Sequence, residues 1–485
     1  MISSTTPRWI IVLLALFLAT NVVCLLNDIL YFPLVSGGVL VAYLAITNLP
    51  WFFAAMAFVT PLSVWFEFKD FGFSFSLPTE PVFFGMMVFF WAKVLIEGSF
   101  DRKLFREPAI WALITLLLWQ ILSVVTSTMP MVSVKYFLSN FWYVSCFFFM
   151  GYHLFKNPLH IKRFLWGYII AFSGVILYTL VRHAGVGFTH KATGWVTYPF
   201  VENHGIYGAM LTMCIPFLLM YVVRSFVLTK RSFISFIAVI LVVLFAAGLV
   251  FSFTRAAWLG MGIALAFPIL LNLRISFQTI FWLLLILGGS GMVYQFELNK
   301  ELSRNKTHSA NNLGEHLQSI SNVNNDVSNL ERINRWNCGL RMFQERPVTG
   351  WGPGTYMFQY APFQKRSEMT IISTNNADVG GIHSEFLNPM VESGVVAGLA
   401  FLAFVLLVIR AGMNAYYASN DAEVKTLLMA GMMGLISYDV HGVLNNYLDI
   451  DKTATLFWAL SGMVVALSIP KKKEAPTGGA SFNQP

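Results

Sequence analysis

The sequence predicts an all-α polytopic membrane protein with about 12–14 transmembrane helices and one large polar segment between them. Composition is the first reason, because 56% of the 485 residues are hydrophobic and only 12% are charged, about half the charged fraction of an average soluble domain. The arrangement of the apolar residues is the second. They form continuous runs of about 20 residues, long enough for a helix to cross a bilayer, and do not alternate with polar residues as in a membrane barrel.

About fourteen such runs occur along the chain. The first lacks a small-residue cleavage site and is followed closely by another, so we expect a retained helix and not a removed signal peptide. Only Asn48-Leu49-Pro50 separates the second run from the third, and proline can end one helix or start the next, which leaves the count at 12–14. The expected spans are roughly 9–26, 31–48, 51–66, 81–97, 109–126, 134–155, 161–182, 203–223, 232–251, 256–273, 276–295, 386–409, 424–444 and 453–469.

Lysine and arginine are distributed unevenly over the short loops between these spans. About sixteen lie in one set of alternate loops and about six in the other, which is a clear positive-inside asymmetry. It predicts a multi-pass protein with both termini in the cytoplasm and the large polar segment on the other side of the membrane, which in a bacterium means the inner membrane and the periplasm. The net charge of +8 is therefore explained by topology and does not indicate a nucleic-acid partner.

This reading divides the chain into four parts. Residues 1–295 should form a membrane domain of about eleven spans, and residues 296–384 a periplasmic, mainly helical loop domain. Residues 385–470 should contain the last spans, and 471–485 a disordered cytoplasmic tail, since that stretch is basic and then small and polar. The four cysteines show no metal or disulfide spacing.

The polar segment has a helical pattern of its own. Ser328-Asn-Leu-Glu331 is a capping box, which predicts a helix from there to about Gln344. The residues expected on its apolar stripe are Ile333, Trp336, Leu340 and Phe343. A turn-rich Gly350–Gly354 stretch follows, and then an expected loop over residues 364–381.

Arginines are the first candidates for a functional site. Arg255 lies where two spans meet on the outer side. It could be a snorkelling interfacial residue, but a charge this close to hydrocarbon is by default a functional-site hypothesis, and its guanidinium can bind phosphate oxygens bidentately. Arg332 and Arg335 are three residues apart and so share one helix face. A solvated face explains Arg335 equally well, and it explains Arg341 and Arg346 better.

Histidine and its neighbours are the second candidates. His383 lies at the membrane surface beside Glu385, where it could titrate near neutral pH and act as a base, or only cap the following helix. Asn203 and His204 open another span on the outer side. Asp449 and Asp451 could bind a divalent metal, but capping and turn formation suit an outward-facing turn better, so we expect no metal site.

Several of these residues lie in stretches that resemble the O-antigen ligase and polymerase superfamily. The Ser-x-x-Arg-type segment at a span junction is FSFTRAAWLGMG, although Ala256 stands where glycine is common. The Arg-x-x-x-Trp helix with its Pro-x-x-Gly-x-Gly turn is ERINRWNCGLRMFQERPVTGWGPGTY, and the His-x-x-x-Leu segment leading to Glu-x-Gly is HSEFLNPMVESGVVAGLAFL. FVENHGIYGAMLTMCIPF is also similar to the family, and the likeness extends over about residues 190–400.

The resemblance implies a GT-C-like glycosyltransferase that works without a metal or other cofactor. Its donor would be a glycan on undecaprenyl diphosphate, with Arg255 and Arg332, and by their shared helix face Arg335, as diphosphate ligands. His383 would activate the acceptor hydroxyl, with Glu385 and the pair Asn203 and His204 in supporting roles. This agrees with the chemistry, since fixed arginines stabilise the charge that builds on a departing diphosphate.

The acceptor is left open by these motifs. Lipid A-core is favoured, because the HSEFL and PVTGWG segments look like the ligase branch. A polymerase of O-antigen or exopolysaccharide repeats and a protein O-oligosaccharyltransferase are the alternatives within the superfamily. Outside it, a flippase or transporter of lipid-linked glycans would be expected to carry charges deep within its spans, where this sequence has few. A structural or signalling protein would tolerate a change at His383.

Overall fold

The computed structural model describes residues 16, 19–20, 23, 43–68, 73–98, 100–227, 233–279, 282, 327–374 and 380–469. The expected spans 9–26, 31–48 and 276–295 fall largely outside these residues, and residues 296–326 and 471–485 do so entirely. The chain forms two compact units, residues 1–56 and 57–485. In the first, residues 43–47 are helical and α3 (Leu49–Val59) begins. All that follows concerns the second.

Eight helices among the described residues are long and apolar enough to cross a membrane. They are α4 (Thr79–Glu97), α5 (Pro108–Val125), α8 (Pro158–Ala184), α9 (His204–Val227), α10 (Phe233–Phe251), α11 (Arg255–Asn272), α16 (Leu387–Ala418) and α17 (Ala422–Leu444). The expected span 134–155 is built from α6 (Pro130–Tyr143), a π-helical segment (Val144–Met150) and α7 (Gly151–Phe155). The prediction of an all-α polytopic membrane protein is confirmed.

The expected span 51–66 is wrong beyond Val59. A short 3₁₀ turn (Thr60–Leu62) leads into β1 (Val64–Phe68), which pairs with the antiparallel β2 (Phe73–Leu77) so that Val64 faces Leu77. Pro61 explains the break, because it lacks an amide hydrogen and clashes with the preceding turn of a helix. The β-branched and aromatic residues after it favour a strand.

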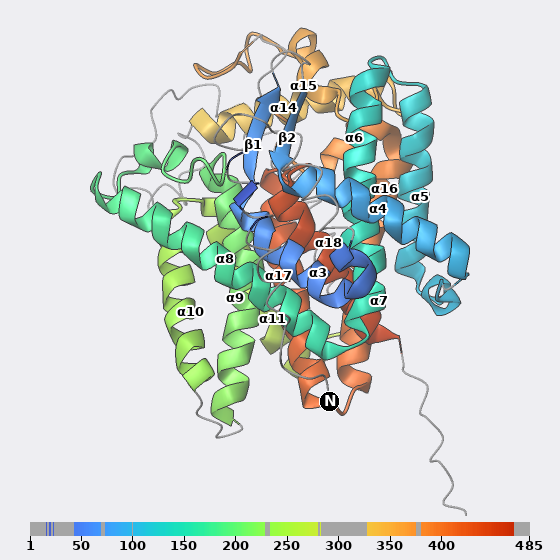
Figure 1. Ribbon diagram of the computed structural model, residues 1–485. Coiled ribbons are helices and arrows are strands. Elements are labelled where there is room, and N and C mark those ends of the chain that lie inside the picture. The colour runs from blue at the N-terminus through green and yellow to red at the C-terminus, as the bar shows by residue number, and fades with distance from the viewer. Residues whose placement is uncertain are drawn as a thin grey trace, which may run out of the picture. The chain divides into compact units, whose positions relative to one another are not determined.

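Helix α18 (Asp451–Ser468) forms the centre of this second unit, next to α16 and α17 (Figure 1). Every residue from Asp451 to Ala466 is buried, as expected for a helix that is enclosed on all sides. The Asp451 carboxylate accepts hydrogen bonds from Ser63 Oγ at 2.6 Å and Thr79 Oγ1 at 2.7 Å, and lies 3.2 Å from Lys452 Nζ. Both ends of the β-hairpin are thereby attached to α18.

Two close helix contacts determine where the candidate residues lie. Helix α11 crosses α17 at Gly260, where a Cβ atom would collide with the Ser437 carbonyl, and α9 also packs on α17. Helix α14 (Val327–Glu345) packs near the start of α16, as does the short α15 (Tyr356–Gln359). These two helices lie at the upper end of the bundle in Figure 1. The loop domain thus covers the end at which α9, α11 and α16 begin.

Candidate active site

Helix α14 occurs close to its predicted ends, and Trp336 and Phe343 of the expected apolar stripe pack against a buried core cluster, but polar residues take up most of the buried face. Its buried side chains are Glu331, Asn334, Arg335, Cys338 and Met342, while Leu340 is 40% exposed. Polar residues occupy the inner face because they satisfy one another there, which removes most of the cost of burying them. The expected capping box is also absent from the described helix: it already includes Ser328, whose Oγ accepts a hydrogen bond from Arg332 Nη1 at 3.2 Å.

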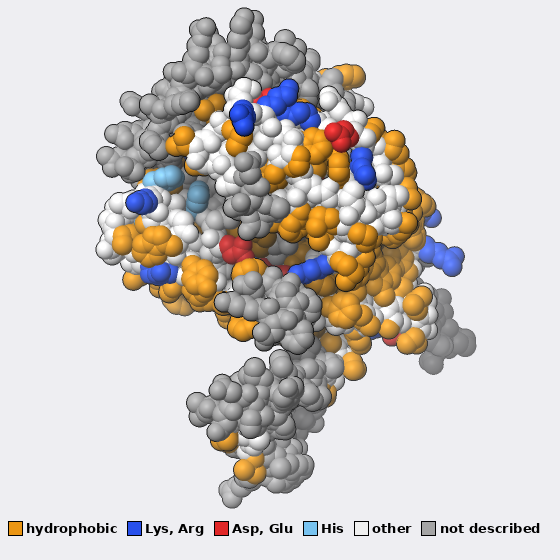
Figure 2. Space-filling model, turned by 90° about the horizontal axis from the view of Figure 1, so that it is seen from above, with side chains coloured by type: hydrophobic (Ala, Val, Ile, Leu, Met, Phe, Trp, Pro, Cys, Tyr) orange, Lys and Arg blue, Asp and Glu red, His pale blue; other side chains and the backbone are white. Residues whose placement is uncertain are grey.

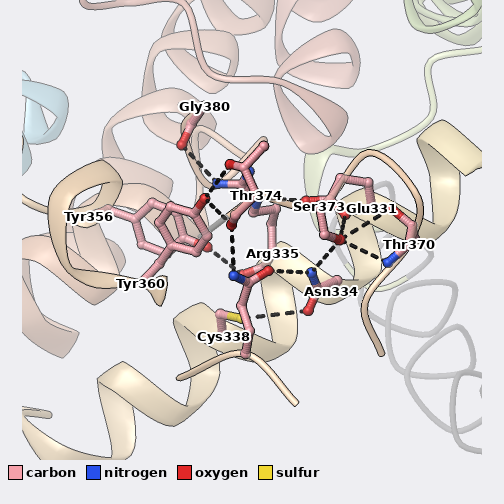
Figure 3. Close-up of polar contacts among 11 residues, drawn as sticks. Glu331, Asn334, Arg335, Cys338, Tyr356, Tyr360, Thr370, Ser373, Thr374 and Gly380 are labelled. Carbon is pink, nitrogen blue, oxygen red and sulfur yellow. Dashed lines mark hydrogen bonds and ion pairs between the residues drawn. The ribbon is translucent and has the colours of Figure 1, made fainter. Parts of the chain in front are cut away.

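Arg335 lies at the centre of a buried polar cluster (Figure 3). Its Nε donates to Glu331 Oε1 at 2.8 Å, its Nη1 donates to the Gly380 carbonyl at 3.1 Å, and its guanidinium stacks 3.9 Å above the Tyr360 ring. The Arg335 and Glu331 side chains are only 4% and 8% exposed. Glu331 also accepts hydrogen bonds from Thr370 and Ser373. Since a buried pair is stable only when its remaining polar atoms are bonded, the cluster fixes the loop after residue 360 to α14.

Arg332, on the neighbouring face, contacts a different part of the chain. Its Nε donates to the Leu444 carbonyl at 3.1 Å, at the end of α17, and its Nη1 donates to Asn329 Oδ1 at 3.1 Å. The carbonyl end of a helix carries partial negative charge and attracts a cation. Arg332 is half-buried and therefore joins the loop domain to the membrane helices.

The five residues Leu444–Leu448, here called the α17–α18 turn, collect these contacts. The backbone N–H of His383 donates to Asn446 Oδ1 at 3.0 Å. Glu385 Oε1 accepts from the Leu448 N–H at 2.8 Å, from the Tyr447 N–H and from the Tyr438 hydroxyl at 2.7 Å. Burial raises the pKa of Glu385 to about 7. Glu385 thus supports the turn, and His383 is held to the turn through its own backbone.

His383 is neither a helix cap nor a group that titrates near neutral pH. Helix α16 begins at Leu387 with Phe386 as its N-cap residue, and His383 has a left-handed backbone with φ 57°, which is uncommon for a residue other than glycine. Trp336 Nε1 donates to its carbonyl at 3.2 Å. Burial, with the nearby Arg332 and Arg335, lowers the pKa of His383 to about 3. The imidazole is therefore uncharged at neutral pH and able to accept a proton.

Asn203 and His204 connect Arg255 to the same turn. Asn203 Oδ1 accepts from the N–H groups of Gly205 and Ile206 at 2.9 and 3.1 Å and so caps α9. Thr254 Oγ1 donates to the His204 carbonyl at 2.8 Å, and Arg255 follows as the first residue of α11.

Tyr447 completes this connection, because its hydroxyl lies so close to Gly205 that a Cβ atom there would collide with it. The N-terminal end of α9 therefore lies against the α17–α18 turn, and the N-terminal end of α11 lies against that of α9; helix dipoles favour anions at both ends. Figure 2, a view from this end, shows Lys and Arg side chains over the face and acidic side chains near its middle. Burial raises the pKa of Glu202, and burial together with the charge of Glu202 raises the pKa of Asp449 to about 6.

The turn is the part of the site that sequence reasoning missed. The sequence pattern of this stretch indicated turn formation, and it could not show the hydrogen bonds to residues 332, 383 and 385 because they join segments far apart in the chain. The density of asparagine and aspartate over residues 445–451 was the available signal.

Two of the family-like segments contact each other: the Gly-rich turn and the Glu-x-Gly sequence in α16. Glu392, on α16, accepts hydrogen bonds from the Gly354 N–H through Oε2 at 2.8 Å and from the Tyr356 N–H through Oε1 at 2.9 Å. Its backbone carbonyl accepts from the Gly352 N–H at 2.8 Å. Gly394 has φ 86°, and a Cβ atom there would collide with the Val348 carbonyl. The Gly-rich turn is thus seated on α16, nine residues after His383.

Two further findings bear on what the site can do. Among the residues that the structure describes, no group of three or more His, Cys, Asp or Glu side chains is placed to hold a metal ion. Residues 240–402 match the family described as O-Antigen ligase. This match confirms the resemblance to the superfamily, and the matched segment contains Arg255, Arg332 and His383. A comparison with curated proteins gave no match.

Proposed function

We propose, starting from the O-antigen ligase match over residues 240–402, that this protein transfers a glycan from undecaprenyl diphosphate to an acceptor hydroxyl in the periplasm. The observation that carries the proposal is the meeting of Arg332 and His383 at the α17–α18 turn. A cation for the leaving group and an uncharged base are the two groups that this transfer needs. The enzyme lies in the inner membrane with both termini in the cytoplasm.

Arg255 and Arg332 bind the donor diphosphate in this proposal. The N-terminal ends of α9 and α11 add partial positive charge next to Arg255. Charge on the diphosphate increases as the sugar leaves, so these groups stabilise the transition state more than the bound donor. No metal ion is required, since the arginines supply the positive charge. Arg335 is occupied by Glu331, Gly380 and Tyr360, and we assign it the task of orienting α14, and so Arg332.

His383 takes the proton from the acceptor hydroxyl. The acceptor oxygen forms a bond to the anomeric carbon, the bond from that carbon to the phosphate oxygen breaks, and undecaprenyl diphosphate leaves with the electron pair. A histidine with a pKa near 3 is a weak base in the empty site. A bound diphosphate compensates the charge of Arg332 and thereby raises the basicity of the imidazole. Donor binding thus prepares the base.

Lipid A-core is the acceptor that we favour, because of the HSEFL and PVTGWG segments. Deletion of the gene, followed by electrophoresis of the cell's glycans, tests this choice. We expect long polymers that remain on undecaprenyl diphosphate and none on lipid A-core. Lipid A-core that carries a single repeat unit would instead identify a polymerase, and loss of glycans from proteins alone would identify a protein O-oligosaccharyltransferase. Donor that accumulates on the cytoplasmic side would indicate a flippase.

A further inference from the structure

A basic cavity lies at the far end of α16 from His383. It has a volume of about 420 Å³ between the ends of α11 and α16. Its polar lining consists of Arg274, Ser276, Gln278, Arg410, Asn414 and Tyr417. Arg410 is 16 residues beyond the break at Gly394, where α16 leaves helical geometry, and at 1.5 Å per residue this places the cavity roughly 24 Å along the helix from that break. It is therefore a separate feature.

No acidic side chain balances the charge of this cavity among the described residues that line it. Its lining contains two arginines and no carboxylate. Neither guanidinium forms a hydrogen bond or ion pair with any residue in the described part of the chain. A cavity of about 540 Å³ on the other side of the same helix end differs in this respect, because Lys156 there lies 2.6 Å from the Asp101 carboxylate and Asp421 is also present. Lys156 thus has an acidic partner, whereas Arg274 and Arg410 have none among the described residues.

The cavity has a polar wall held in place by a hydrogen bond, and exposed apolar side chains lie beside it. The Tyr417 hydroxyl donates to the Leu271 carbonyl at 2.9 Å and fixes α16 to the end of α11. Just before Arg274, Ile269 and Leu273 are 60% and 67% exposed. A ligand with a phosphate and an acyl chain could contact both the polar wall and these apolar side chains, whereas free phosphate would contact only the polar wall.

We propose that Arg274 and Arg410 bind the phosphate of an anionic phospholipid from the surrounding membrane. Arginine forks match phosphate oxygens bidentately, and basic recesses between transmembrane helices bind the headgroups of anionic lipids. The lipid joins the C-terminal ends of α11 and α16. The opposite end of α11 carries Arg255, and the opposite end of α16 follows His383. The proposal does not depend on the proposed glycosyl transfer.

Thermal unfolding of the purified full-length protein in detergent tests this site. The probes are short-chain phosphatidylglycerol, short-chain phosphatidylcholine and inorganic phosphate. Phosphatidylglycerol should raise the Tm in a saturable way, because a ligand that binds only the folded state stabilises it. The other two probes should have little effect. A rise with inorganic phosphate alone would assign the site to free phosphate and overturn the lipid source.

A double variant, Arg274→Asn with Arg410→Gln, should weaken the apparent affinity for phosphatidylglycerol by at least ~10-fold. Asparagine suits position 274 because Arg274 has a left-handed backbone with φ 52°, which asparagine tolerates. The matched control, Arg102→Gln with Arg106→Gln, removes two other arginines from the 3₁₀ segment Arg102–Arg106 and should keep the response. An unchanged affinity in the first variant, or an equal loss in both, would overturn the proposal. If the double variant does not fold, Arg410→Gln alone carries the same test.

Discussion

Arg332 and Arg341 lie on one helix, yet their contacts predict different effects of substitution. Arg332 reaches the α17–α18 turn, whereas Arg341 pairs with Glu368 at the surface of the loop domain. We expect Arg332→Ala and Arg255→Ala each to abolish glycan transfer while the protein still accumulates in the membrane. Lysine at either position should restore only part of the activity, because it supplies charge without the fork.

Arg341→Ala is the matched control for these two variants. Partly exposed ion pairs contribute about 1 kcal/mol or less, so transfer should remain close to that of the unchanged protein. An in vitro assay with lipid-linked donor measures all of the variants. Equal losses at Arg255, Arg332 and Arg341 would remove the support for a diphosphate site.

His383→Ala should stop turnover without weakening donor binding. A base acts on the acceptor in the transition state, so its loss lowers the rate and leaves the ground-state complex intact. Because the backbone N–H, and not the imidazole, bonds Asn446, the turn should keep its place in this variant. Donor affinity that collapsed would make His383 a donor ligand instead.

The pH profile separates His383 from Glu385. The pKa of about 3 belongs to the enzyme without donor, whose imidazole stays uncharged from pH 8 down to pH 5, so its protonation should cause no loss of kcat/KM, the quantity that reports the free enzyme, in that range. Glu385 has a pKa of about 7 and gains a proton as the pH falls through neutrality. We therefore assign any change near pH 7 to Glu385, and it should vanish in Glu385→Gln. An acid loss centred near pH 6.5 that persisted in Glu385→Gln would contradict the lowered pKa of His383.

Among the elements, the contact between Glu392, Gly394 and the Gly-rich turn makes the sharpest prediction. Gly394→Ala should destabilise the protein by about 1–3 kcal/mol and lower transfer, because the new Cβ collides with the Val348 carbonyl and the left-handed backbone is strained. Gly174→Ala in α8 is the control, since nothing lies within 4 Å of its added Cβ. Thermal unfolding measures both. A Gly394→Ala protein as stable as Gly174→Ala would show that the turn does not depend on this fit.

Sequence reasoning found most helices and failed where tertiary contacts override local pattern. Continuous apolar runs locate spans such as α10 and α17 because length and hydropathy are local properties. The buried face of α14 could not be found this way, since Arg335 is buried only because residues up to 45 positions away supply its partners. The β-hairpin was missed because its first strand is apolar enough to extend the preceding run. Motif likeness selected Arg332 and His383, but not the turn that holds them.

The orientation of the whole molecule can be tested with single cysteines. Ser367 lies in the loop domain and Asn420 between α16 and α17, and both are exposed. In intact spheroplasts, Ser367→Cys should react with a membrane-impermeant thiol reagent and Asn420→Cys should not, as the positive-inside rule requires. The unchanged protein is the control, in which Cys146, Cys214 and Cys338 are buried. The reverse pattern would place the proposed site in the cytoplasm and exclude the periplasmic transfer.

The α17–α18 turn has a consequence for how such an enzyme can diversify. Backbone or side-chain atoms of this turn hold Arg332, His383 and Glu385, and Tyr447 abuts α9 beside Gly205. A shift of the turn would displace Arg332, which faces the leaving group, and His383, the proposed base, together. The spacing of Arg332 and His383 therefore depends on one segment. Relatives that use other sugars or other acceptors should differ in the outer segments around residues 184–202 and 364–381 and keep the α17–α18 turn unchanged.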